Sequence, residues 1–310
     1  LLAKGYDVRA SVRSKNRSEY LYTLMERHGA DTSRLTHVVI DLNSPKGWAD
    51  AVAGVEVGIH MASPLGGDNQ QDPKLIETAK NGVRHVLQAA LDAGIPKVVL
   101  TSSMAAATPP KKTVNHYVDE NFWTNPLSKE INNYRRSKVF AEQLAWEMVA
   151  DQTRTQLTTI LPGSVFGPAL DNSSISSAEI IKLTLQGQIP VMNVTYEVVD
   201  VRDVADLHIL AMEAPEANGE RFLAVIGPLT TRAIAQLLKE EMGDVGKKIL
   251  QIHLPNAVPR VVALFVPQIR TLVPMLSRQF LHTNKKAKSI LGWNPRSPRE
   301  CVVDTAESLF

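Results

Sequence analysis

The sequence predicts an α/β fold of the doubly wound type, in which helices cover both faces of a parallel sheet. Two observations support this prediction. Along the first 167 residues, short apolar runs that suit buried strands alternate with longer segments that have the pattern of amphipathic helices. The composition, with 44% hydrophobic and 21% charged residues, is that of an ordinary globular protein. Ligands of such folds bind beyond the carboxyl ends of the strands, so the residues that end each apolar run are the first candidates for function.

The expected elements follow one another in a regular order. LLAKG (1–5) has the pattern of a helix's last turn, with Gly5 at the terminating position. DVRASVR (7–13) is expected to be a strand, and the polar run through His28 a helix. Further strands, separated by helices or by a loop and a helix, are expected at 37–42, 57–63, 97–103 and 157–167.

Past residue 167 the alternation loosens. Residues 197–213 predict a strand and a helix that return to the large domain, and 221–226 predict another strand. The rest is rich in proline and short helical patterns, and is expected to form a smaller lobe over the mouth of the site. The predicted division is a large domain of residues 1–167, joined by 197–213, and a lobe of residues 168–196 and 214–310.

Charge and cysteine content restrict the class of protein. A net charge of +2 gives no electrostatic reason to expect a nucleic acid, so a small-molecule partner is expected. Cys301 is the only cysteine, which excludes an internal disulfide and fits a cytoplasmic location. The histidines show no metal-ligand spacing, so no metal site is expected. The apolar segment 257–276 is interrupted by prolines and arginines, and predicts short buried or pocket-lining helices and no membrane span. Association of this segment with a membrane surface is the alternative.

The motif YRRSK (134–138) is the strongest chemical signal. Tyr134 and Lys138 share one face of a helix, because they are four residues apart. A nearby ammonium favours phenolate and lowers the tyrosine pKa, which suits Tyr134 to give a proton to a carbonyl that receives hydride. Ser103 ends the preceding strand, where its hydroxyl would hold the substrate oxygen. The competing interpretations are a solvated lysine on an amphipathic helix and, for Ser103, a helix-capping serine.

Taken together, the motifs resemble the extended short-chain dehydrogenase/reductase family. The closest likeness is to its dihydroflavonol-4-reductase-like carbonyl reductases, alongside the NAD-dependent epimerase/dehydratases. It covers essentially the whole chain. The segments that carry it are VRASVRS (8–14), HMASP (60–64), KVVLTSSMAAAT (97–108), VDENFW (118–123), YRRSK, LPGSVFGP (161–168) and KAKSILGWNPRSPRE (286–300).

The resemblance implies a Rossmann-type sheet that binds NADP and a smaller lobe that binds substrate. It makes Ser103, Tyr134 and Lys138 the catalytic set, with Lys138 also on the nicotinamide ribose. The implied reaction is the NADPH-dependent reduction of an aldehyde or ketone. The implied cofactor contacts are Asp41 and Leu42 beside the adenine, Ala62, Ser63 and Pro64 in the cofactor loop, and Pro162, Gly163, Ser164 and Val165 beside the nicotinamide.

Arg13 predicts which cofactor is used. An acidic residue at the end of the second strand suits the 2′-hydroxyl of NAD, whereas an arginine there accommodates the 2′-phosphate of NADP. Arg13 occupies that end, and Lys15 and Arg17 follow it, so NADP(H) is favoured over NAD(H). His60, at the end of another strand, is expected to support the cofactor loop without transferring a proton.

The sequence departs from the family pattern at its start. A glycine-rich turn should join a first strand to the helix that ends at LLAKG, and no such turn occurs in the chain. We therefore expect that roughly 20 residues with the first strand are missing, and that the chain by itself is weakly active. Other functions stay open. These are a nucleotide-sugar epimerase or dehydratase, a hydroxysteroid dehydrogenase, and an NADP-sensing protein without turnover. A homodimer formed through helices is also allowed by the resemblance.

Overall fold

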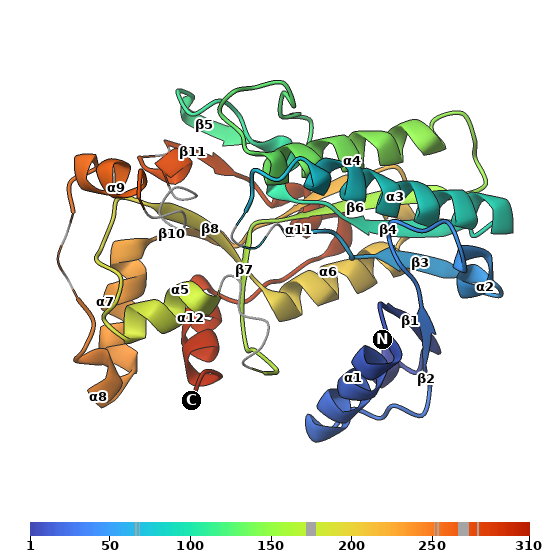
Figure 1. Cartoon of the computed structure of the whole chain (residues 1–310), viewed down its shortest axis with the longest axis horizontal. Coiled ribbons are helices and arrows are strands. Elements are labelled where there is room, and N and C mark those ends of the chain that lie inside the picture. The colour runs from blue at the N-terminus through green and yellow to red at the C-terminus, as the bar shows by residue number, and fades with distance from the viewer. Residues whose placement is uncertain are drawn as a thin grey trace.

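The computed structural model describes residues 1–65, 67, 69–171, 178–250, 252, 254–265, 273–277 and 279–310. Its main sheet contains four parallel strands in the order β3-β4-β6-β9. Figure 1 shows helices α3 and α4 on one side of this sheet and α6 on the other. The bounds are β3 (Val57–His60), β4 (Lys97–Thr101), β6 (Gln156–Pro162), β9 (Arg221–Ala224), α3 (Lys74–Ala93), α4 (Asn133–Val149) and α6 (Val201–Glu213).

Alternate residues of the central strands bury on opposite faces, which confirms the doubly wound prediction. Val98 and Leu100 of β4 pack among the side chains of α3 and α4, whereas Val99 packs on the other face with Leu207 of α6. Helix α11 (Lys285–Leu291) joins that second face. Helices therefore cover both faces of the sheet and exclude water from them, which is why the strands are continuous apolar runs in the sequence.

A second, smaller group of elements carries the first residues. Strands β1 (Val8–Val12) and β2 (Leu35–Val39) pair in parallel and pack with α1 (Lys15–Arg27), forming the lobe at the lower right of Figure 1. Among the described strands, β1 pairs only with β2 and β3 only with β4, so the parallel sheet is divided between them. The expected absence of a first strand stays a prediction.

The start of the chain matches the predicted helix end. The 3-10 turn η1 (Leu2–Lys4) terminates at Gly5, whose φ of 85° lies in the left-handed region that favours glycine. Lys4 Nζ and the Tyr6 hydroxyl each contact the Glu213 carboxylate, at 2.8 and 2.9 Å, and so tie this segment to the end of α6.

The predicted strand 157–167 is in fact two strands in two sheets. It breaks at Gly163, where β6 leaves the main sheet and β7 (Ser164–Phe166) begins. β7 belongs to a three-stranded sheet in the order β10-β8-β7, with β8 (Thr195–Asp200) and β10 (Gly227–Thr230). A Cβ at Gly163 would collide with the carbonyl oxygen of Glu197, so the crossing of two backbones requires glycine here.

The smaller lobe is built on this three-stranded sheet. Helices α5 (Ala178–Leu185), α7 (Thr231–Glu241) and α12 (Pro298–Glu307) surround its core, to which Ile181, Val198 and Leu238 contribute fully buried side chains. The other elements described are α2 (Trp48–Val52), η2 (Met104–Ala107), β5 (Val114–Val118), η3 (Pro215–Ala217), α8 (Gly243–Gly246), α9 (Ala257–Val262), η4 (Val273–Met275) and β11 (Gln279–His282), of which β5 and β11 pair in parallel.

The predicted boundary at residue 214 does not hold for every element. β9 and α11 fall in the numbering of the lobe but belong to the main sheet and its cover. In 197–213, α6 packs on the main sheet while β8 belongs to the three-stranded sheet. The apolar pattern identified these strands correctly, but it carries no information about which sheet each joins.

The apolar segment 257–276 is less buried than expected. In α9 and the residues after it, Val261 is 58% and Phe265 is 81% exposed, so the prediction of buried helices is wrong there. Residues 266–272 lie outside the described part of the chain. No helix in the described part combines the length and the apolar character needed to cross a bilayer.

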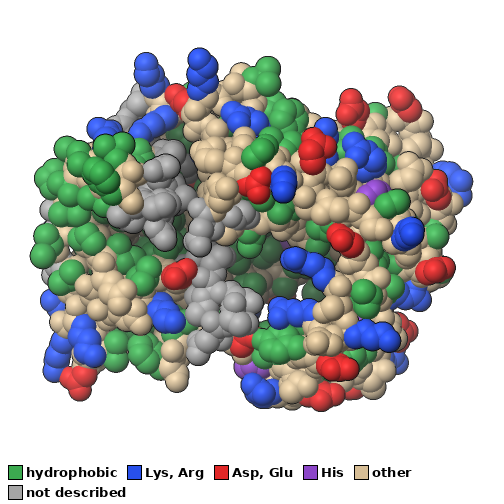
Figure 2. Space-filling model, in the orientation of Figure 1, with side chains coloured by type: hydrophobic (Ala, Val, Ile, Leu, Met, Phe, Trp, Pro, Cys, Tyr) green, Lys and Arg blue, Asp and Glu red, His purple; other side chains and the backbone are tan. Residues whose placement is uncertain are grey.

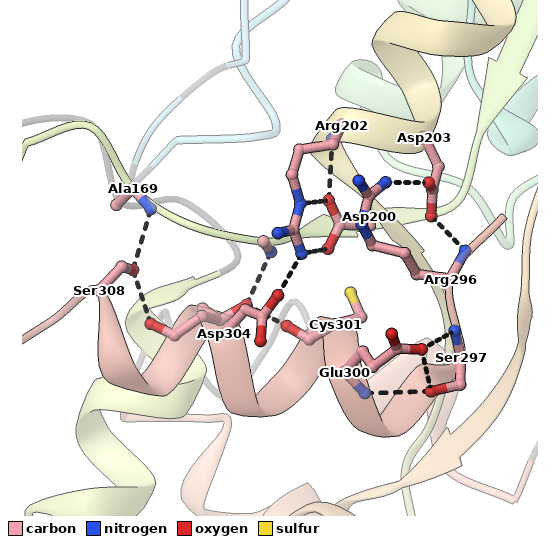
Figure 3. Close-up of polar contacts among 12 residues, drawn as sticks. Ala169, Asp200, Arg202, Asp203, Arg296, Ser297, Glu300, Cys301, Asp304 and Ser308 are labelled. Carbon is pink, nitrogen blue, oxygen red and sulfur yellow. Dashed lines mark hydrogen bonds and ion pairs between the residues drawn. The ribbon is translucent and has the colours of Figure 1, made fainter. Parts of the chain in front are cut away.

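Charged groups fasten α12 to the start of α6 (Figure 3). Asp200 caps α6 by accepting from Arg202 N. The Arg202 guanidinium then bridges Asp200 and Asp304, at 2.7 and 2.5 Å. Asp203 binds Arg296 in the same way. Two ion-paired arginines thus hold the last helix, α12, against the start of α6.

Candidate active site

Ser103 follows the end of β4, and its side chain has two neighbours. Its hydroxyl accepts a hydrogen bond from Ala105 N at 3.2 Å, which makes Ser103 the cap of η2. The same side chain also lies close enough to the Tyr134 hydroxyl to lower its pKa. The capping interpretation is therefore correct for Ser103, and it coexists with the contact that a role in catalysis requires.

Tyr134 and Lys138 lie on one face of α4, as their spacing predicts. Asn132 starts this helix by accepting from Arg135 N at 2.9 Å. Lys138 Nζ lies 5.8 Å from the centroid of the Tyr134 ring, over its face. The structure therefore brings Ser103, Tyr134 and Lys138 together from two elements.

Burial dominates the electrostatics of the pair. It raises the pKa of Tyr134 above the usual 10, and the nearby Ser103 hydroxyl and the charge of Arg135 offset only part of this. The expectation of a lowered tyrosine pKa is therefore wrong in its net direction, because burial outweighs the effect of the neighbouring charges. Burial lowers the pKa of Lys138 itself to about 8.

Lys138 is a buried cation that lacks an acceptor within the described residues. Only 7% of the residue is exposed, and no hydrogen bond or ion pair joins its ammonium to a described side chain or carbonyl. A buried ammonium without acceptors is costly. Ribose hydroxyls of a nicotinamide nucleotide would supply them, so the donor set here fits that group.

The loop after β3 reaches the same place. Ala62 and Ser63 line a small cavity together with His60, Ser102 and Lys138. Pro64 is half-buried beside them, whereas Ala62 is exposed. Burial, and secondarily the charge of Lys138, lower the pKa of His60 to about 4, so its ring is neutral at pH 7. The expectation that His60 transfers no proton stays a prediction.

Sequence reasoning missed how this loop is fastened to α4. Tyr134 N donates to Gln70 O at 3.0 Å, Asn132 Nδ2 donates to Gln70 Oε1 at 2.7 Å, and Asn133 Nδ2 donates to Gln71 O at 2.6 Å. Three hydrogen bonds therefore join the candidate cofactor loop to the first turn of the candidate catalytic helix. The pair of asparagines directly before Tyr134 was the only available signal.

The third candidate segment follows β6. Pro162 is buried as the last residue of β6, and Gly163 N donates to Ala224 O at 3.0 Å. Ser164 and Val165 are half-buried at the start of β7. Because β6 is the neighbour of β4 in the sheet, this segment lies next along the carboxyl edge from the strand that ends before Ser103.

The adenine-side candidates lie in or beside the separate lobe of β1 and β2. Arg13 follows β1 directly and is exposed, as is Asp41, whose carboxylate accepts from Asn43 N at 2.8 Å. Leu42 packs against Gly82 of α3. No hydrogen bond or ion pair in the described structure links Arg13 or Asp41 to the catalytic candidates. Figure 2 shows Lys and Arg side chains around a hollow between this lobe and the body of the molecule.

Comparisons with known proteins identify the family of the chain. A profile of the NAD dependent epimerase/dehydratase family matches residues 1–227. Cinnamoyl-CoA reductase 1 of Petunia hybrida is 35% identical over 315 residues, which cover 100% of this chain and 86% of the relative. NADPH-dependent methylglyoxal reductase GRE2 of Saccharomyces cerevisiae is 28% identical over 338 residues, covering 100% of this chain and 93% of the yeast protein.

Solved structures give the same result. The yeast methylglyoxal/isovaleraldehyde reductase Gre2, complexed with NADPH, superposes with a TM-score of 0.81 at 25% identity, over 100% of this chain and 92% of that one. Gre2 of Candida albicans, also with NADPH, gives 0.82 at 27% identity, over 100% and 93%. The protein is an NAD(P)-dependent oxidoreductase, and the chain belongs to the NAD-dependent epimerase/dehydratase family.

Proposed function

We propose that the protein reduces an aldehyde or ketone to an alcohol with NADPH, and that Tyr134 donates the proton. The observation that carries the proposal is the convergence of Ser103, Tyr134 and Lys138, with a buried ammonium that needs acceptors. NADPH, when bound, supplies the hydride to the carbonyl carbon. The Ser103 hydroxyl holds the carbonyl oxygen, and the Tyr134 hydroxyl passes its proton to that oxygen as the alcohol forms.

Lys138 has two parts in this scheme. Its ammonium holds the nicotinamide ribose hydroxyls, which relieves the cost of its own burial. Its positive charge also stabilises the phenolate that Tyr134 becomes once the proton has left. Tyr134 is protonated at neutral pH, because burial raises a pKa that already lies near 10, and a protonated phenol suits a proton donor in the reducing direction.

The residues that would hold the cofactor come from each strand end described above. NADP(H) over NAD(H) is part of the proposal, since Arg13 stands where the 2′-phosphate is accommodated and relatives are named as NADPH-dependent or solved with NADPH. The proposed contacts are Arg13, Asp41, Leu42, Ala62, Ser63, Pro64, Tyr134, Lys138, Pro162, Gly163, Ser164 and Val165. The smaller lobe is proposed to bind the substrate.

The test is consumption of NADPH with methylglyoxal and isovaleraldehyde as separate substrates. It is run on the chain of 310 residues. The controls are Tyr134→Phe and Arg13→Ala. We expect turnover that Tyr134→Phe abolishes, and a preference for NADPH over NADH that Arg13→Ala weakens. NADPH binding without turnover on any carbonyl would refute the proposal.

A further inference from the structure

A buried ionic cluster lies between helix α4 and the main sheet. Its centre is Glu142, whose side chain is 0% exposed. Glu142 Oε1 accepts from Arg221 Nε and Thr159 Oγ1, each at 2.8 Å. Oε2 accepts from Ser102 Oγ at 2.5 Å, with a second Arg221 nitrogen at 3.3 Å. We refer to these four residues as the Glu142 cluster, and it joins α4 to β6, to β9 and to the end of β4.

The remainder of the Arg221 guanidinium holds the loop before α4. It donates to the carbonyl oxygens of Glu120 and Phe122, the latter at 3.0 Å, and lies 3.7 Å from the centroid of the Trp123 ring. Glu120 Oε1 in turn accepts from Leu223 N at 3.0 Å. The VDENFW segment, to which the proposed function gives no role, is therefore fastened to β9 through Arg221 and through the Glu120 carboxylate.

An ion pair at this position is not explained by stability alone. Removing two charges from water costs about as much free energy as their attraction returns, and apolar side chains of similar volume often serve as well. The neighbouring positions of α4 are indeed apolar, with Val139, Ala141 and Ala145 buried. A cluster in which every polar group is hydrogen-bonded differs from apolar packing in one respect. It fixes the relative orientation of the elements it joins as well as the distance between them.

The elements whose relative orientation the Glu142 cluster fixes are the end of β4 and helix α4, which carry the candidate catalytic groups. Ser102 is the residue directly before Ser103, so its bond to Glu142 ties the end of β4 to α4. Tyr134, Lys138 and Glu142 stand at successive four-residue steps along one side of that helix. Ser102, Lys138 and Glu142 also line the same small cavity.

We propose that the Glu142 cluster is a positioning unit that sets the Ser103 hydroxyl against the Tyr134 hydroxyl. The inference rests on the proposed function, because it assigns the cluster to the same catalytic set. Glu142 and Arg221 touch neither substrate nor cofactor in this scheme. They act through the relative placement of β4 and α4, where a displacement of about 1 Å can cost about 100-fold in rate.

The sharpest variant is Ser102→Ala, which removes one hydrogen bond and leaves Ser103 and the ion pair intact. We expect kcat for carbonyl reduction to fall about 10-fold while KM for NADPH changes less than about twofold. Ser102→Thr, which keeps a hydroxyl, is expected to restore most of the rate. Glu142→Gln should lower kcat further, because its amide nitrogen cannot accept from Arg221.

The matched control is Asp203→Asn, which breaks the ion pair between the buried Asp203 at the start of α6 and the half-buried Arg296. It is expected to lower the midpoint of thermal unfolding at least as much as Ser102→Ala while leaving kcat unchanged. If the Glu142 cluster has only a structural role, kcat should fall in proportion to the loss of thermal stability. That relation should then be the same for the variants of the cluster and for Asp203→Asn.

A second measurement needs no substrate. The protein is labelled with 3-fluorotyrosine, and the Tyr134 resonance is assigned by its loss in Tyr134→Phe. Because the nearby Ser103 hydroxyl lowers the Tyr134 pKa, Ser102→Ala should move the fluorine titration midpoint to higher pH, and Asp203→Asn should not. Unchanged midpoint and unchanged kcat in Ser102→Ala and Glu142→Gln would overturn the inference. If the unsubstituted protein reduces no carbonyl, the proposed function fails. The fluorine titration midpoint of Tyr134 then tests by itself whether the Glu142 cluster positions the Ser103 and Tyr134 hydroxyls.

Discussion

Replacing Lys138 by methionine should make the protein more stable and inactive. Methionine fills a similar volume without the charge, so the change in packing is small. In the folded protein the lysine pKa falls from 10.5 to about 8, because the ammonium is buried away from water. Each pH unit between these values corresponds to about 1.4 kcal/mol, so the charged form costs the fold about 3 kcal/mol at pH 7.

The pH dependence distinguishes this charge effect from packing. The unfolded chain binds the proton more tightly, so the cost is full below pH 8 and fades as the pH rises towards 10.5. We expect Lys138→Met to raise the free energy of unfolding by about 2 to 3 kcal/mol at pH 7 and by less than about 1 kcal/mol at pH 10. Urea titrations at the two pH values measure both differences.

Two results would refute this reasoning. If Lys138→Met is no more stable than the unsubstituted protein at pH 7, the ammonium is already well solvated or paired. If the gain is the same at pH 10 as at pH 7, it comes from packing and not from charge. Lys138→Arg serves as the control, since it keeps a charge that does not titrate in this range and should show no gain.

Three further predictions follow from the same structure. His60 has its pKa lowered to about 4 from 6.5, so the free energy of unfolding should fall by about 3 kcal/mol from this source between pH 6.5 and 4, and urea titrations of His60→Gln should lack that part of the decline. Asn132→Ala removes the α4 cap and the bond to Gln70, so calorimetry should show a loss of about 1 kcal/mol, and fluorescence titration should show weaker NADPH binding. Gly163→Ala should cost about 1 to 3 kcal/mol in urea unfolding, because its methyl group meets the Glu197 carbonyl, whereas the same change at exposed Gly219 meets no atom and acts only through its positive φ.

Much of the fold could be predicted because its signals are local. The strand β4 was found from an apolar run whose alternate residues, Val98 and Val99, bury on opposite faces. The break at Gly163 was not found, because the cause is the backbone of Glu197, which lies in another strand. The placement of β9 was missed for the same reason, since a buried strand has the same pattern at any position in a sheet.

The candidate site divides in a similar way. Tyr134 and Lys138 were found because helical spacing puts residues four apart on one face. Arg221 and Glu142 are 79 residues apart, and no local pattern connects them. The direction of the Tyr134 pKa was also beyond the sequence, because it depends on how deeply the packed protein buries the hydroxyl.

The single thiol gives the protein a natural reporter of local unfolding. Cys301 is 0% exposed beneath the ion-paired face of α12, and burial raises its pKa, so the reactive thiolate is suppressed as well as covered. A maleimide reagent can therefore label the native chain only when the last helix detaches. The labelling rate measures how often α12 opens, at a position set by the wild-type sequence and without an introduced cysteine.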